Sequence, residues 1–236
     1  SVKGRPLYVV TVTEPSGNPD NRPVVWIVAR QHAFESGGSW SSEGLLRFLA
    51  SDSPEAAAIR RSLVFRVCPM INPDGASDGG TRFNARGVDL NRHWHGSDPL
   101  SDDTARAPEI TQLKKALADW RKDHRLDLWI NLHNNDMVWD EDGDYVRFAP
   151  KDQEVRARNL ESILRQEIAF TGSYTLAESD AATESVVAAA TGALGLIMEI
   201  KTGYLEGLDR FTGKDIWLAH GRGLARAARR FLASGQ

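Results

Sequence analysis

Two histidines and one glutamate have the types and spacing needed to hold a metal ion. His32 and Glu35 form an H-x-x-E pair directly after the apolar run 23–30, and His133 ends a second apolar run, 126–133. Side chains three residues apart at the start of a helix lie on one face, so His32 and Glu35 can bind one ion. Two histidines, one glutamate and a water form a standard catalytic zinc site. We therefore predict one Zn²⁺ ion bound by His32, Glu35 and His133.

A loop over residues 72–94 supplies groups that could recognise an anion. It contains Arg82, Arg86 and Arg92, together with Asn84 and Asn91. An arginine pairs two-pronged with a carboxylate, and an asparagine amide can add a donor. A second arginine near zinc could stabilise negative charge that develops on a carbonyl oxygen. The alternative is a basic loop that only faces solvent.

Glu199 lies within the apolar run 194–200. A carboxylate in a buried strand costs free energy unless it is paired or lies near the strand end. One interpretation is a general base that takes a proton from a metal-activated water. The other is an edge strand with Glu199 facing solvent.

The elements that must position these residues alternate between strands and helices. Apolar runs predict strands near 7–13, 23–30, 63–70, 126–133 and 193–200. Apolar residues at helical spacing predict helices near 42–50, 108–122, 155–170, 179–190 and 215–232. This order predicts an α/β fold, with a mostly parallel mixed central sheet and helices on both faces. Sites in such sheets form at the carboxyl ends of strands, where both metal-binding segments lie.

Composition excludes several classes of protein. The chain has 236 residues and a net charge of -3, which argues against non-specific nucleic-acid binding. No apolar run has the length of a membrane helix. Its one cysteine allows no intrachain disulfide, which is compatible with the cytoplasm and with a bacterial secreted or periplasmic enzyme. Without repeats or linkers, we expect residues 1–236 to form a single catalytic domain, of unknown oligomeric state.

Taken together, these motifs resemble the zinc carboxypeptidase superfamily, which contains carboxypeptidase A. Within that superfamily, the sequences of the runs ARQHAFESGGSW and PMINPDG are more similar to cytosolic carboxypeptidases and their bacterial relatives than to the digestive enzymes. The matching motifs are, in order, Gly4–Tyr8, His32-x-x-Glu35, Asn72–Gly75, Gly87–Arg92, Leu132-His133 and Met198–Ile200. The chain starts at the first or second element of that family, so an upstream element is expected to be missing.

The resemblance implies an enzyme that hydrolyses C-terminal peptide or isopeptide bonds with zinc-activated water. It implies that His32, Glu35 and His133 are the zinc ligands and that Glu199 is the general base. The substrate would be the C-terminus of a peptide or protein.

The resemblance also implies roles for three loop residues. Arg82 corresponds to the arginine that polarises the scissile carbonyl, and Asn91 and Arg92 correspond to the pair that holds the terminal carboxylate. The chain departs from the digestive enzymes in one respect, because Tyr174 is the nearest tyrosine upstream of Glu199. We assign no substrate-closing role to that tyrosine.

Side-chain specificity and some rival functions stay open. Asp180 and Glu184 would favour a basic terminal residue if they face the pocket, whereas Arg147 or Lys201 could favour glutamate. A zinc amidase of the same architecture could act on peptidoglycan peptides or N-acyl amino acids. A non-catalytic binding module is a further alternative, which the complete ligand set and Glu199 disfavour.

Overall fold

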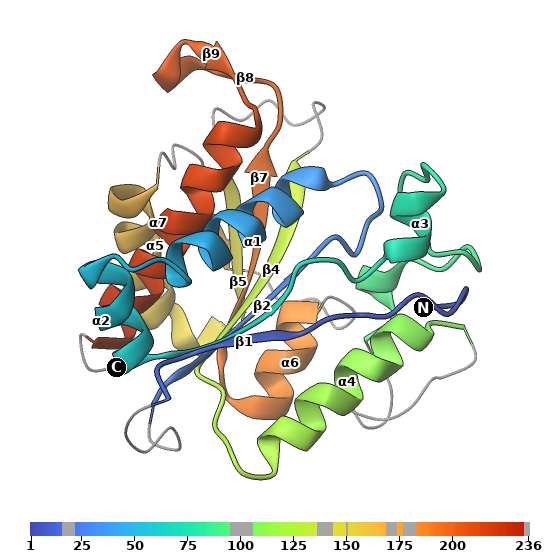
Figure 1. Cartoon of the computed structure of the whole chain (residues 1–236), viewed down its shortest axis with the longest axis horizontal. Helices are drawn as coiled ribbons and strands as arrows, with labels where there is room; N and C mark the ends of the chain where they lie inside the picture. The colour runs from blue at the N-terminus through green and yellow to red at the C-terminus, as the bar shows by residue number, and fades with distance from the viewer. Residues whose placement is uncertain are drawn as a thin grey trace.

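A central sheet brings the segments of the metal-binding motifs together. The structure is a computed structural model, and it describes residues 1–15, 22–94, 106–135, 144–149, 151–168, 174–176 and 183–233. In this part of the chain, seven strands form a sheet in the order β1-β3-β2-β4-β7-β5-β6 (Figure 1). They are β1 (Val10–Val12), β2 (Val24–Ala29), β3 (Val64–Cys68), β4 (Leu128–Asn135), β5 (Tyr145–Ala149), β6 (Tyr174–Leu176) and β7 (Leu194–Lys201).

The strand directions confirm the predicted mixed, mostly parallel sheet. The pairs β2–β3, β2–β4, β4–β7 and β5–β6 are parallel. The pairs β1–β3 and β5–β7 are antiparallel. Because β2, β4 and β7 are parallel neighbours, their carboxyl ends lie at one edge of the sheet, where the candidate site residues follow.

Helices cover both faces of the sheet, as the sequence predicts. One apolar core lies under α1 (Ser36–Leu49), α2 (Pro54–Ser62), α5 (Glu154–Glu167) and α7 (Lys214–Ala233). A second core lies between the opposite face and α4 (Pro108–Arg121) and α6 (Thr183–Thr191). Side chains of β2 enter the two cores alternately, Ile27 the first and Trp26 the second. Because every β2 residue is buried, its sequence is continuously apolar, as expected for a strand covered on both faces.

The helix after β2 begins earlier than the sequence suggests. We predicted a helix near 42–50, but α1 already begins at Ser36. The periodicity of apolar residues is weak in its first turn because Gly37 and Gly38 stand there in close contact with β4. The early start brings the helix N-terminus directly after Glu35.

Some shorter elements have weaker sequence signals. Helix α2 was not predicted, although Ser53 accepts a capping bond from the Ala56 N–H and Pro54 is its first residue. Strand β5 and the short helix α3 (Pro73–Ser77) were also not predicted. Three 3-10 turns complete the helical elements of the described residues, namely η2 (Leu90–Arg92), η3 (Lys151–Gln153) and η4 (Glu206–Leu208).

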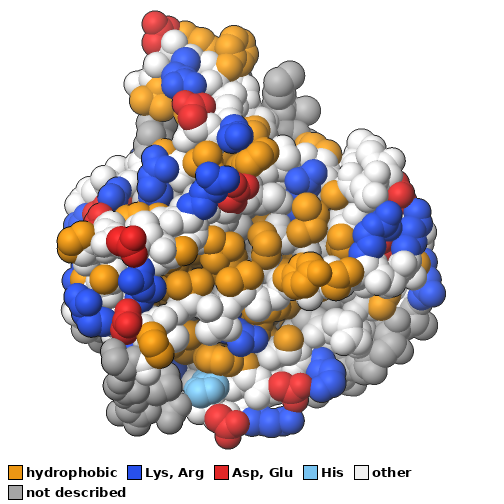
Figure 2. Space-filling model, in the orientation of Figure 1, with side chains coloured by type: hydrophobic (Ala, Val, Ile, Leu, Met, Phe, Trp, Pro, Cys, Tyr) orange, Lys and Arg blue, Asp and Glu red, His pale blue; other side chains and the backbone are white. Residues whose placement is uncertain are grey.

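A small hairpin, β8 (Tyr204–Leu205) and β9 (Arg210–Phe211), projects from the body of the molecule beyond the end of β7 (Figures 1 and 2). Its Tyr204 and Phe211 rings pack edge to face and remain exposed, as does Leu208. Figure 2 shows acidic and basic side chains interspersed on this face. Among the described helices, none is long and apolar enough to cross a membrane.

Candidate metal centre

A tight turn after β2 places the first two metal-binding residues. Arg30 directly follows β2 and has a positive φ of 63°, a conformation that a residue with a side chain adopts at a cost of about 1 kcal/mol. Its Nε donates to Ala33 O at 2.6 Å, which closes the turn. The backbone reverses here, so that His32 and Glu35 stand at the sheet edge before α1 begins.

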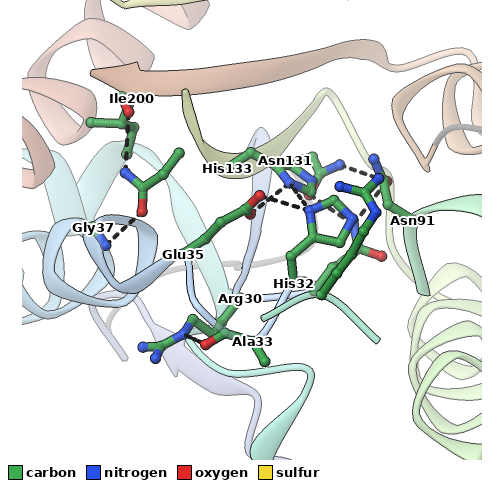
Figure 3. A network of polar contacts seen from close by, with 12 residues as sticks. Arg30, His32, Ala33, Glu35, Gly37, Asn91, Asn131, His133 and Ile200 are labelled. Carbon is green, nitrogen blue, oxygen red and sulfur yellow. Dashed lines mark hydrogen bonds and ion pairs between the residues drawn. The ribbon is translucent and has the colours of Figure 1, made fainter. Parts of the chain in front are cut away.

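The structure brings the three predicted ligands together in one buried cluster (Figure 3). Glu35 Oε1 lies 2.7 Å from His32 Nδ1, and Glu35 Oε2 lies 2.8 Å from His133 Nδ1. The two Nδ1 atoms are 3.1 Å apart. His32, Glu35 and His133 expose only 3%, 4% and 1% of their surfaces, which makes this a closed, pre-assembled donor set.

The electrostatics of this cluster fit a bound cation. Burial alone would raise the pKa of Glu35, but His133 and His32 lower it to about 2. Burial alone would lower the pKa of His133, but Glu35 outweighs it and raises that pKa to about 9. A buried carboxylate therefore stays ionised here and draws positive charge to the cluster. Two imidazole nitrogens and one carboxylate are the donor set of catalytic zinc sites, with a fourth position left for water.

Asp89 supports the site from the loop side, a role that its place in the sequence does not indicate. Its Oδ1 lies 3.2 Å from His32 Nε2, the ring atom that faces away from Glu35. Its Oδ2 accepts bonds from Nε and a terminal nitrogen of Arg82, both at 2.8 Å. Burial would raise the pKa of Asp89, but His32 and Arg82 lower it well below its usual range. A carboxylate behind a ligating histidine fixes the ring orientation, and the same group holds Arg82 beside the site.

Strand register places Glu199 beside the ligands. In the parallel pair β4–β7, Glu199 is the direct partner of His133. Burial raises the pKa of Glu199, as does Glu35, while His133, His32 and Arg147 oppose that change. The edge-strand interpretation is wrong, because β7 lies between β4 and β5.

Asn91 belongs to a buried polar network next to the ligands (Figure 3). Its Oδ1 accepts bonds from Gln31 Nε2 at 3.0 Å, Asn131 Nδ2 at 3.1 Å and Thr183 Oγ1 at 2.7 Å. Trp94 Nε1 donates to Gln31 Oε1 at 2.8 Å. These bonds fix the Asn91 side chain by its oxygen. The network could not be predicted from the sequence, because its members come from four separate segments.

Arg92 is exposed at the end of the 3-10 turn η2. Its NH1 donates to the backbone oxygen of Asn91 at 3.3 Å. The Asp89 side chain accepts from the Asn91 N–H at 3.0 Å and so starts this turn. One carboxylate therefore contacts Arg82, His32 and the turn that carries Arg92.

Two residues considered for specificity form a partly buried ion pair with each other. Arg147 on β5 contacts Glu184 Oε1 on α6 at 2.5 Å, and the Glu184 side chain is fully buried. Neither residue therefore offers an uncompensated charge to a substrate. Asp180 lies outside the described residues, and Lys201 ends β7.

A His–Glu–His cluster at the ends of parallel core strands is the metal centre of a zinc-dependent hydrolase. The sequence profile of the family described as Peptidase M14, zinc carboxypeptidase, matches residues 1–197. The chain belongs to the zinc carboxypeptidase family, and His32, Glu35 and His133 form its zinc site. The predicted family and cofactor are confirmed.

Characterised relatives match parts of the chain. Cytosolic carboxypeptidase 2 of Homo sapiens is 43% identical over 97 residues, which are 40% of this chain and 11% of that protein. Cytosolic carboxypeptidase 6 of Mus musculus is 33% identical over 137 residues, which are 56% of this chain and 24% of that protein. The chain thus spans a small fraction of the length of these relatives.

Solved structures show the same fold at low identity. The metallo-carboxypeptidase of Burkholderia cenocepacia has a TM-score of 0.87 and 22% identity, covering 100% of this chain and 63% of that one. The metallo-carboxypeptidase of Pseudomonas aeruginosa, in complex with (2-guanidinoethylmercapto)succinic acid, has a TM-score of 0.78 and 22% identity. The aligned part is 98% of this chain and 63% of the Pseudomonas aeruginosa chain.

Proposed function

We propose that this chain is a zinc metallocarboxypeptidase that hydrolyses a C-terminal peptide or isopeptide bond. The observation that carries the proposal is the register of β4 and β7, which places Glu199 opposite His133 of the zinc site. A carboxylate beside a zinc ligand can serve as the general base for hydrolysis by metal-activated water. The family match and the printed names of the relatives support the same reaction.

In this mechanism Glu199 is the general base. Bound zinc supplies Lewis acidity, which makes water nucleophilic at neutral pH. Glu199 takes a proton from the attacking water as the water oxygen bonds to the carbonyl carbon. The same carboxyl group then gives the proton to the leaving amine nitrogen when the C–N bond breaks. Burial raises the pKa of Glu199, which strengthens it as a proton acceptor.

Residues 82–92, which we call the substrate loop, bind and polarise the substrate in this proposal. Arg82, held by Asp89, stabilises the negative charge on the carbonyl oxygen. The Arg92 guanidinium and the Asn91 amide hold the terminal carboxylate. The exposure of Arg92 and the ordering of Asn91 by the buried network support these roles.

The test is mass spectrometry of a mixed peptide library, incubated with zinc-loaded protein and with chelator-treated protein. The library includes termini with Glu, Arg and Phe, and a parallel sample contains peptidoglycan fragments and N-acyl amino acids. We expect loss of single C-terminal residues in the zinc-loaded sample alone. Internal cleavage, cleavage only of peptidoglycan or N-acyl substrates, or no cleavage at all would contradict the proposal.

A further inference from the structure

Asn134 makes two hydrogen bonds that join the ligand segments to the segment of Glu199, and Figure 3 labels the two partners, Gly37 and Ile200. Its Oδ1 accepts the backbone N–H of Gly37 at 2.8 Å. Its Nδ2 donates to the backbone oxygen of Ile200 at 3.1 Å. The side chain is buried, with 4% of the residue surface exposed.

These partners stand next to the residues that act on substrate or metal. Gly37 lies in the first turn of α1, two residues after Glu35, and Ile200 directly follows Glu199. Asn134 itself directly follows His133, and its register partner on β7 is Ile200. The Asn134 side chain therefore contacts the segment after Glu35 and the segment after Glu199. Asn134 itself belongs to the third segment, the strand β4 that carries His133.

The N-terminus of α1 explains why this bond is needed. The first N–H groups of a helix have no partner within the helix, and a side chain at the N-cap commonly accepts one of them. The N-cap of α1 is Glu35, which makes no capping bond because its carboxylate faces the two histidines. Asn134 supplies the missing acceptor from β4.

The fit around Asn134 is close. A Cβ atom added to Gly37 would lie 2.4 Å from Asn134 Nδ2 and 2.9 Å from Oδ1. Only glycine at position 37 therefore lets the amide reach the helix and β7 at once.

We infer that Asn134 is a positioning residue, which sets the distance between the zinc ligands and the Glu199 carboxylate. The inference rests on the proposed function, because Glu199 is the base only in that reaction. It assigns Asn134 no contact with metal or substrate. Its effect is to keep α1, β4 and β7 in one arrangement, so that the base stays within reach of the attacking water.

The experiment replaces the amide and separates its effects on metal, turnover and structure. In the zinc-saturated Asn134→Ala variant we expect kcat to fall by about 10- to 100-fold, the range for groups that orient ligands, with KM changed less than about threefold. Amide hydrogen exchange at Gly37 should become faster, because its acceptor is gone. Ser42→Ala is the matched control, since it removes a buried bond of the same helix to Gly38 O. It should leave kcat and Gly37 exchange unchanged.

A second variant covers the case in which Asn134→Ala does not fold. Gly37→Ala keeps the amide but displaces it, and we expect a similar loss of kcat. The double variant should be no worse than Asn134→Ala alone, because both changes break the same contact. A kcat within twofold of wild type, a kcat loss that tracks zinc occupancy, or independent effects in the double variant would overturn the inference. Wild-type protein inactive on every substrate would instead refute the proposed function, and unchanged Gly37 exchange would still refute the contact.

Discussion

The zinc site and the substrate loop differ in how the fold holds their side chains. His32 and Glu35 follow core strand β2, His133 lies near the end of the neighbouring strand β4, and each exposes less than a twentieth of its surface. The substrate loop lies in the chain between β3 and α4 and contains no strand of the sheet, and the Arg82 side chain keeps 38% of its surface exposed. Paired core strands carry or directly precede the first group, whereas side-chain hydrogen bonds hold the second. Metal binding should therefore withstand the loss of the exposed Arg92, and substrate binding should not.

The largest effect is expected from loss of a zinc ligand. His133→Ala should abolish stoichiometric zinc binding and lower kcat/KM by at least about 1000-fold, because the ion contributes several kcal/mol to the transition state. Metal analysis and peptide hydrolysis would measure both. His124→Ala is the control, since that ring stacks on Trp120 away from the site. Full activity in His133→Ala would contradict the assignment of His133 as a zinc ligand.

The next largest effect is expected from loss of the Glu199 carboxylate, which, like His133, lies on a core strand. Glu199→Gln keeps the shape of the side chain and removes the proton acceptor, so kcat should fall by about 100- to 10000-fold. Zinc content should stay at the wild-type level, since Glu199 is not a ligand. Steady-state kinetics at measured zinc occupancy would show this. Equal turnover by the variant and the wild type would leave the fold intact but defeat the mechanism.

A smaller effect is expected in the substrate loop. Arg92→Met should raise KM by about 10- to 100-fold, because hydrogen bonds to a charged group contribute roughly 1.5–3 kcal/mol. Zinc affinity should not change. Arg86→Met, in the same loop and also exposed, is the matched control. If Arg92→Met weakened zinc binding as much as substrate binding, the claim that Arg92 acts on substrate and not on the zinc site would be wrong.

The smallest effect is expected at Asp74, away from both regions. Burial would raise its pKa, but the Lys3 N–H, Arg5 and Ser1 outweigh it and lower the pKa below 3.8. The carboxylate therefore stabilises the fold above pH 3.8, and this contribution is lost as the pH falls through the lowered pKa. Asp74→Asn should lower the free energy of unfolding by about 1–3 kcal/mol at pH 7, with unchanged activity.

Urea denaturation at pH 7 and pH 3 would test the Asp74 prediction. The difference between variant and wild type should shrink at pH 3. Asp78→Asn is the control, because Asp78 forms an exposed ion pair with Lys3, worth less than about 1 kcal/mol. A difference for Asp74→Asn that grows towards low pH would contradict the assigned sign.

The strand-held region could be predicted from sequence, and the physical reason is local. Continuous apolar runs mark the core strands, and a metal-binding residue directly after such a run must lie at the sheet edge. His32, Glu35 and His133 were found in this way, and the resemblance to a family favoured the general base over the solvent-facing alternative for Glu199. The order of the strands, and with it the pairing of His133 with Glu199, required the structure.

The supporting contacts could not be predicted, because they join segments far apart in the chain. Asp89 in the substrate loop contacts His32, and Asn134 joins α1 to β7. Arg147 and Glu184 each looked like a charge for the substrate, yet they neutralise one another. Side chains whose contacts join distant segments have no recognisable sequence pattern, because tertiary packing determines their partners.

Titration of the metal-free protein with zinc is the sharpest test of a single zinc site in this protein. Bound zinc and the rate of C-terminal residue release would be measured in the same samples. We predict that the rate rises in proportion to bound zinc and stops rising at one ion per chain. A rate that requires a second ion, or one that is already maximal without zinc, would contradict a single metal centre formed by His32, Glu35 and His133.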